Sequence, residues 1–114
     1  MELFVVEGPD AGRSFSLAAE SVIGRDPTAA VHLTDEEVSR RHAIISLGEG
    51  LATVEDLGSV NGTHTDAGQV VGEAAVRAGD RIRVGQTVME LRELGGPEDP
   101  ENLKPTKTSM ERPT

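Results

Sequence analysis

Short apolar runs separated by turn-forming residues fill the first 94 positions of the chain. The run at residues 3–6 leads into Gly8-Pro9-Asp10-Ala11-Gly12, a strong turn signal, beyond which Phe15 and Leu17 alternate with serines. Alternation with a period of two places the apolar side chains on one face of a half-buried strand. We therefore expect the two segments to pair as a β-hairpin.

Six further segments carry the aliphatic and β-branched residues that strands favour. They cover residues 22–23, 31–33, 42–47, 51–56, 81–84 and 88–91. The alternation is clearest in Arg81-Ile82-Arg83-Val84, where we expect the apolar side chains to point inward and the arginines outward. Short strands at this spacing predict an all-β sandwich or barrel.

Residues 34–47 also fit a helix. Thr34-Asp35-Glu36-Glu37 has the spacing of a capping box, and Val38, His42 and Ile45 share one helical face. Ala43-Ile44-Ile45, however, is typical of a buried strand, and a helix here would be a single insertion in a β chain. We favour a loop over residues 35–40 followed by a strand.

The composition changes at Gly95-Gly96-Pro97, after which prolines and charges replace apolar residues. We expect one folded domain over residues 1–94 and a disordered tail or linker over residues 95–114, since 114 residues leave no room for two cores. The tail is a linker to further domains in the simplest interpretation. Phosphorylation of its threonines is a second hypothesis, in which the tail regulates the domain.

Charge and composition disfavour nucleic acid as a partner. The chain carries a net charge of −9, of which the tail's four acidic and three basic residues account for −1, leaving −8 for residues 1–94. A polyanion is repelled by such a field, and two phenylalanines are the whole aromatic content available for stacking on bases. The basic residues before the tail are all arginines, whose planar fork suits carboxylate and phosphate oxygens, although codon usage explains the bias equally well.

Catalysis by a hydrolytic or metal site is the main alternative to binding, because His32, His42 and His64 accompany many carboxylates. The sequence has no HExxH, GxSxG, Walker or EF-hand pattern, and Asp35-Glu36-Glu37 is better explained as a solvated acidic face. Cysteine is absent, and no apolar run or N-terminal segment predicts a membrane span or a signal peptide. We expect no enzymatic activity, metal, cofactor or membrane insertion, and a cytoplasmic location.

Three motifs follow predicted strands and fall in presumed loops: Gly24-Arg25, Ser39-Arg40-Arg41-His42 and Ser59-Val60-Asn61-Gly62-Thr63. Each has an ordinary explanation taken alone, as a surface charge, a turn serine and a hairpin turn. Together they offer arginine, hydroxyl, amide and glycine on loops of a β scaffold, which is an inventory suited to an oxyanion such as phosphate.

In this order on a β-rich chain, the three motifs resemble the forkhead-associated (FHA) domain family, and residues 7–13 resemble its bacterial members. The resemblance covers residues 1–94. It implies a β-sandwich of about eleven strands, of the SMAD/FHA type, whose loops at one end bind phosphothreonine peptides in Ser/Thr kinase signalling. The partner implied is a phosphothreonine-containing protein, such as a Ser/Thr kinase or its substrate, and the domain belongs to a multidomain protein in one interpretation.

The resemblance also implies roles for the loop residues. Arg25 pairs with the phosphate, the hydroxyl of Ser39 donates to a phosphate oxygen, and Arg40 adds a contact beside it. Asn61 holds the peptide main chain just after the phosphothreonine, and Arg41 is a possible accessory.

Three residues of the motifs are implied to be structural. His42 braces the loop that presents Ser39, Gly62 permits a tight turn next to Asn61, and Gly24 serves the backbone.

Val60 departs from the family pattern, because many members have a threonine there whose hydroxyl contacts the phosphate. We expect an apolar residue at this position to keep the loop packed, and Ser59 to point the other way and not to replace the missing hydroxyl. The departure leaves open a scaffold or dimerisation domain in which the phosphate site is vestigial.

Overall fold

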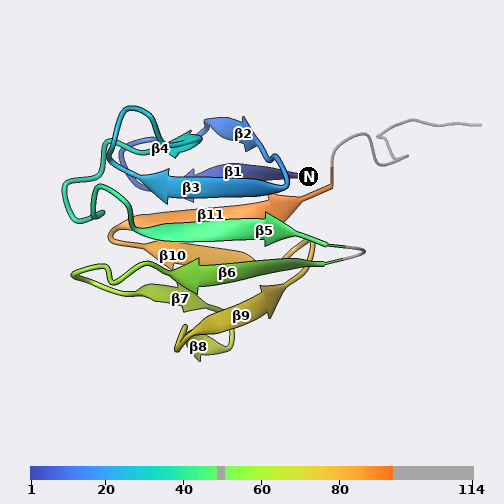
Figure 1. Ribbon diagram of the computed structural model, residues 1–114. Coiled ribbons are helices and arrows are strands. Elements are labelled where there is room, and N and C mark those ends of the chain that lie inside the picture. Colours follow the sequence, from blue (N-terminus) through green and yellow to red (C-terminus); the bar gives the residue numbers. More distant parts are fainter. Residues whose placement is uncertain (49–50, 94–114) are drawn as a thin grey trace, which may run out of the picture.

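The computed structural model describes residues 1–48 and 51–93, which form eleven β-strands and no helix (Figure 1). The strands are β1 (Glu2–Glu7), β2 (Ser14–Ser16), β3 (Glu20–Gly24), β4 (Val31–His32), β5 (Ala43–Leu47), β6 (Ala52–Asp56), β7 (Thr63–Thr65), β8 (Gly68–Gln69), β9 (Glu73–Val76), β10 (Arg81–Val84) and β11 (Thr87–Arg92). Nothing in the described ranges is a helix long and apolar enough to cross a membrane. The predicted tail, residues 95–114, lies outside the described residues.

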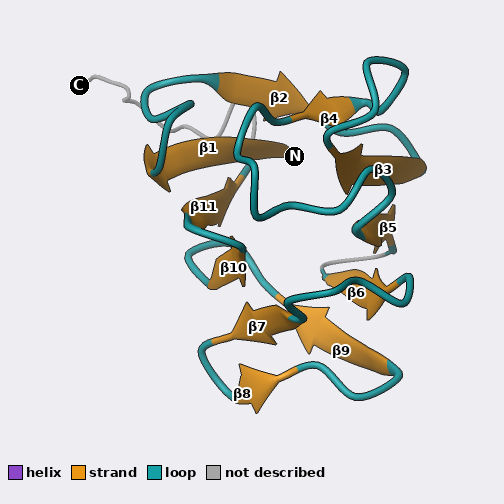
Figure 2. Cartoon of the chain, turned by 90° about the vertical axis from the view of Figure 1, so that its left-hand side faces the viewer, coloured by secondary structure: helices purple, strands orange, loops and turns teal. Residues whose placement is uncertain are grey.

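The strands form two sheets that face each other, as Figure 2 shows. One sheet has the order β2-β1-β11-β10-β7-β8, and the other has the order β4-β3-β5-β6-β9. Neighbouring strands are antiparallel, apart from the parallel pair β3 and β4. The predicted β-sandwich is therefore confirmed.

The core lies between the sheets and is built from alternate positions of the long strands. Its fully buried side chains from the six-stranded sheet are Leu3, Val5, Ile82, Val84, Met89 and Leu91, and those from the other sheet include Ile23, Ala43, Ile45, Ala52 and Val54. Burial of a valine, leucine or isoleucine side chain contributes about 1.5–3 kcal/mol, so the small aliphatic core stabilises the sandwich without aromatic residues inside it.

Each of the eight predicted strand segments contains a strand, and β10 has the predicted bounds. The predicted hairpin of β1 and β2 is also present, with Leu3 paired to Phe15. Residues 36–41 form turns before β5, so the loop-then-strand interpretation of residues 34–47 is confirmed and the helix is wrong. The sequence did not predict β7, β8 and β9, which have two to four residues each and contain no leucine or isoleucine.

Three connections gather at one end of the sandwich, on the left in Figure 1. They are the loops between β3 and β4, between β4 and β5, and between β6 and β7, and they contain all three motifs singled out from the sequence.

Candidate functional site

Gly24 ends β3 where the backbone of the β4–β5 loop crosses it. A Cβ atom at this position would lie 1.9 Å from the Arg40 carbonyl oxygen, so only glycine fits. The close approach lets the Arg25 N–H donate to the Ser39 carbonyl and the Asp26 N–H to the Arg40 carbonyl, each at 3.1 Å. The two loops are thereby joined through their main chains at the point where the motif side chains emerge.

The exposed Arg25 side chain is held beside the same loop, because its Nε donates to the Val38 carbonyl at 2.5 Å. The bond fixes the guanidinium group while both terminal nitrogens keep their donors for a ligand. Among residues 1–48 and 51–93, Arg25 forms no ion pair, although Asp26, Asp35 and two glutamates lie nearby in sequence. A carboxylate partner among these residues therefore does not account for Arg25, and its charge faces solvent.

Ser39 links the β4–β5 loop to the β6–β7 loop. Its hydroxyl oxygen accepts the Val60 N–H at 3.1 Å, and its own N–H donates to Nδ1 of His42 at 3.0 Å. A hydroxyl that accepts a hydrogen bond still carries its own hydrogen, so Ser39 can donate to an anion at this end of the sandwich.

His42 is fully buried and connects the two loops through its ring. Because Nδ1 accepts the Ser39 N–H, the proton lies on Nε2, which donates to the Gly62 carbonyl at 2.8 Å. Gly62 itself has a φ of 82°, a left-handed conformation that favours glycine. The neutral ring thus fixes the separation between Ser39 and the turn that carries Asn61.

Asn61 is exposed, and its Nδ2 donates to the Glu37 carbonyl at 2.8 Å. The bond leaves the Oδ1 acceptor and the second amide hydrogen for another partner. Asn61 therefore lies against the loop that carries Ser39, with two hydrogen-bonding positions left over from its bond to Glu37.

Val60 is 88% exposed, so the expectation that its side chain packs the loop is wrong. The turn uses Val60 through its N–H, which bonds to Ser39, and directs the isopropyl group into solvent. Ser59 is occupied inside the loop, where its hydroxyl donates to Asp56 at 2.5 Å and accepts the Gly62 N–H at 2.9 Å. Its hydroxyl is thus already used within the turn.

Arg40 and Arg41 are both exposed in the turn after Ser39. Arg40 forms a loose ion pair with Asp26 at 3.6 Å. The pKa of the Asp26 carboxyl is lowered mainly by the N–H and hydroxyl of Thr28, which donate to it, and further by the charge of Arg40. Solvent screens such an exposed pair, so Arg40 can exchange Asp26 for another anion at little cost.

Asp56, at the end of β6, organises the β6–β7 loop and was missed by the sequence reasoning. Its carboxylate accepts the N–H groups of Gly58 and Ser59 and the hydroxyls of Ser59 and Thr63. Partial burial by itself raises the pKa of Asp56, but the hydrogen bonds from Ser59 and Thr63 outweigh it and hold the pKa below its usual value. An aspartate two residues before glycine is the signal of such a turn.

Asp35 is only 3% exposed, so the interpretation of Asp35-Glu36-Glu37 as a wholly solvated face is wrong at its first residue. Its carboxylate accepts the Gln86 N–H at 2.7 Å, the Thr87 hydroxyl at 2.9 Å and the Glu37 N–H at 2.9 Å. Asp35 ties the β4–β5 loop to the start of β11, across the sandwich from β5. The remaining two acids, Glu36 and Glu37, are exposed.

The geometry as a whole brings Arg25, Ser39 and Asn61 to one end through hydrogen bonds among their loops, with Arg40 and Arg41 beside them. His32 and His64 do not join this group. Within the described ranges, no set of three or more histidines and carboxylates is arranged to hold a metal ion. Exposed cationic and neutral donors around an open rim are suited to holding an anion.

Comparison with known proteins gives a consistent result. Residues 4–95 match the family model Yop-YscD_cpl, described as the cytoplasmic domain of the inner membrane component of T3SS. The FHA domain-containing protein FhaB of Mycolicibacterium smegmatis is 42% identical over 92 residues, which cover 80% of this chain and 59% of FhaB. The chain thus spans about three fifths of the length of that curated relative.

Two solved structures share the architecture. One comes from a study of phosphothreonine-dependent FHA domain interactions and is 34% identical, with a TM-score of 0.72 over 81% of this chain and 94% of the other. The second is Mycobacterium tuberculosis EmbR in complex with a low-affinity phosphopeptide, 28% identical, with a TM-score of 0.71 over 80% of this chain and 24% of EmbR.

Proposed function

The chain belongs to the FHA domain family, and we propose that residues 1–94 are a phosphothreonine-dependent peptide-binding module that catalyses no reaction. The observation that carries the proposal is the convergence of Arg25, Ser39 and Asn61, which are far apart in sequence and come from three loops joined by hydrogen bonds. Similarity to an FHA domain studied for phosphothreonine-dependent interactions supports it.

The chemistry of the site suits a phosphate dianion. The terminal nitrogens of Arg25 supply charge-assisted donors, and the Ser39 hydroxyl supplies a neutral one. Hydrogen bonds to a charged group contribute about 1.5–3 kcal/mol each, so contacts from Arg25 and Ser39 would make the phosphate a major source of the binding free energy. Arg40 and Arg41 add positive charge at the rim of a domain that is otherwise acidic.

The partner in this proposal is a protein phosphorylated on threonine by a Ser/Thr kinase in the cytoplasm, and neither a cofactor nor nucleic acid takes part. Residues 95–114 are proposed to be a linker or tail outside the binding domain, because prolines and charges replace apolar residues there.

A second function, a scaffold whose phosphate site is vestigial, is favoured by one observation. Val60 presents an exposed isopropyl group where many family members place a hydroxyl. The Val60 N–H nevertheless orients Ser39, so the loop still supports the hydroxyl that remains.

A phosphothreonine peptide library screen, followed by titration of the best sequence, tests the proposal. Arg25→Ala and Ser39→Ala are expected to abolish measurable binding. Arg25 is exposed, so its variant is expected to keep the urea unfolding midpoint within about 0.5 M of the parent. Ser39→Ala also loses the hydrogen bond from the Val60 N–H and is expected to lower the midpoint by about 0.5–1 M. Replacing phosphothreonine by phosphoserine is expected to weaken binding, and unphosphorylated threonine to remove it.

Arg77→Ala is the matched control, because Arg77 is exposed between β9 and β10. Its substitution removes the same charge at a position away from the three loops. Unchanged affinity in Arg25→Ala would refute the assigned site. Absence of any phosphothreonine binder, together with dimerisation of the purified domain, would favour the scaffold instead.

A further inference from the structure

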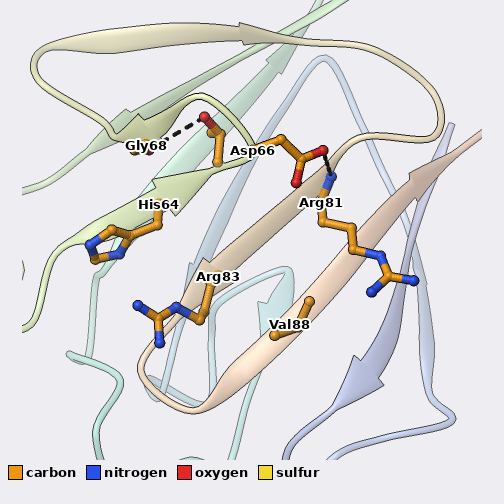
Figure 3. Close-up of a pocket in the computed structure, with 7 residues that line it drawn as sticks. His64, Asp66, Gly68, Arg81, Arg83 and Val88 are labelled. Atoms are coloured by element: carbon orange, nitrogen blue, oxygen red, sulfur yellow. Dashed lines mark hydrogen bonds between the residues drawn. The ribbon is translucent and has the colours of Figure 1, made fainter.

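The outer face of the six-stranded sheet carries a second concentration of arginine. In β10 the alternation predicted from the sequence buries Ile82 and Val84 and exposes Arg81 and Arg83. Figure 3 shows both arginines along β10, with neighbouring side chains from β7 and β11 around them. They line a pocket of about 340 Å³, whose remaining lining residues are His64, Thr65, Asp66, Gly68 and Val88.

Strand register explains why these residues meet. Arg83 stands opposite Val88 of β11 on one side and opposite His64 of β7 on the other. Cross-strand neighbours lie about 4.5–5.5 Å apart at Cβ, so cationic, apolar and imidazole groups form one continuous row. Val88 is half-buried and offers an apolar surface at the β11 end of the row.

Glu90 of β11 stands opposite Arg81, but its carboxylate accepts hydrogen bonds from Arg92 and forms an ion pair with it. Residues 1–94 have a net charge of −8, and Arg13, Arg40 and Arg92 each pair with a carboxylate. Within residues 1–48 and 51–93, neither Arg81 nor Arg83 takes part in an ion pair.

Asp66, the one carboxylate lining the pocket, turns an oxygen toward the backbone N–H of Arg81 at 3.3 Å (Figure 3). It is therefore engaged with the main chain, and both guanidinium groups keep donors for an external anion.

The row also adjoins the phosphate-binding loops. β7 begins at Thr63, directly after Asn61 and Gly62, and His64 is its second residue. Three residues span at most about 10 Å even when fully extended, and Gly62 turns the chain, so His64 lies within that distance of Asn61. On the other side, the turn after β10 contacts the same loops, since Gln86 Nε2 donates to the Glu37 carboxylate at 2.8 Å.

We propose that Arg81, Arg83 and His64 bind an acidic segment of the phosphorylated partner, C-terminal to the phosphothreonine. The inference rests on the proposed function, in which Asn61 holds the peptide just after the phosphothreonine and β7 leads from there to His64. Guanidinium forks pair with carboxylates through two parallel hydrogen bonds, and the open sheet face accommodates an extended chain. An acidic domain that leaves two adjacent arginines unpaired selects for anionic residues at this position.

The test uses the best phosphothreonine peptide from the library screen with three C-terminal extensions, of four glutamates, four glutamines or four lysines. Exposed charge pairs are individually weak, so the glutamate extension is expected to bind about three- to tenfold tighter than the glutamine extension in 50 mM salt. The advantage is expected to disappear in 0.5 M salt, where the screening length falls below about 5 Å. Lysine is expected to bind no tighter than glutamine.

The double variant Arg81→Gln/Arg83→Gln supplies the decisive comparison, with Arg77→Gln as the matched control. In the double variant the glutamate extension is expected to bind no tighter than the glutamine extension, since the remaining surface is acidic, while the unextended peptide keeps its affinity. Arg77→Gln is expected to retain the full glutamate advantage.

Two results overturn the binding site at Arg81, Arg83 and His64 but not the proposed function. One is an equal affinity advantage of the glutamate extension in both variants, and the other is no such advantage in the parent although the unextended peptide binds. Failure of the unextended peptide to bind overturns the proposed function and this inference together.

Discussion

Gly24 lies so close to the main chain of the β4–β5 loop that no side chain fits, and Gly24→Ala tests whether this contact holds the loops of the site together. The added Cβ would lie 1.9 Å from the Arg40 carbonyl oxygen and 2.7 Å from its carbonyl carbon, both main-chain atoms. Ordinary contact begins near 3.4 Å, so the β4–β5 loop must move by about 1.5 Å from the end of β3.

A shift of this size breaks the hydrogen bonds from Arg25 to Ser39 and from Asp26 to Arg40, which are 3.1 Å long in the parent. Each lost hydrogen bond costs about 1 kcal/mol, and forced separation of packed segments costs about 1–3 kcal/mol more. The expected loss is therefore about 3–5 kcal/mol, a large part of the 5–15 kcal/mol that stabilises a typical domain.

Urea unfolding followed by far-ultraviolet circular dichroism measures the loss. With a slope of about 1.5 kcal/mol per molar urea, the midpoint is expected to fall by roughly 2–3 M. Gly48→Ala is the matched control, because the nearest atom that its Cβ would meet in the described part of the chain is the Leu51 carbonyl oxygen at 3.6 Å. A midpoint for Gly24→Ala as high as that of Gly48→Ala would refute the account of loop contact at β3.

Two further predictions concern the β6–β7 loop. Val60→Thr is expected to strengthen phosphothreonine binding about three- to tenfold by adding an exposed hydroxyl beside Ser39, measured by titration, and an unchanged or weaker affinity would show that position 60 does not face the phosphate. Asp56→Asn is expected to cost about 1–3 kcal/mol at pH 7, because each carboxylate oxygen accepts two hydrogen bonds and one of these oxygens would become a donating amide nitrogen. The pKa of Asp56 is lowered in the folded protein, so the ionised carboxylate stabilises the fold above about pH 4, and this stabilisation is lost as pH falls through the folded pKa. The difference in urea unfolding midpoint between parent and Asp56→Asn should therefore narrow between about pH 6 and pH 3. A difference in midpoint that stays constant over this pH range would contradict the stabilising role of the ionised Asp56 carboxylate.

The sequence predicted the strands whose burial alternates strongly. β10 was predicted at its observed bounds because Ile82 and Val84 alternate with two arginines, which leaves one possible inward face. β8 contains only Gly68 and Gln69, both exposed, and forms the edge of its sheet. Its position depends on pairing with β7 and not on the preference of its own residues, so no local pattern could indicate it.

In the site, too, residue types could be predicted from the sequence, whereas features that depend on tertiary contacts could not. The motifs identified Arg25, Ser39 and Asn61, because a charged or amide side chain in a loop is visible in the sequence. The outward direction of Val60 could not be predicted, since it follows from the bond between its N–H and the Ser39 hydroxyl, 21 residues away. Burial of Asp35 likewise depends on Gln86 and Thr87, about 50 residues further along the chain.

The neighbouring residues Gly24 and Arg25 have different roles, and measuring unfolding with and without phosphopeptide can distinguish them. A ligand that binds only the folded state stabilises it by about 2.7 kcal/mol at one hundred times its dissociation constant. Arg25→Ala should keep the unliganded stability and lose this increment, because Arg25 is exposed and acts on the ligand. Gly24→Ala should be less stable than the parent without ligand. Phosphopeptide should restore part of that stability, because binding favours the arrangement in which the β3–β4 and β4–β5 loops are in contact. The two residues adjoin in sequence, but one supplies charge to the site and the other permits the main-chain contact that positions that charge.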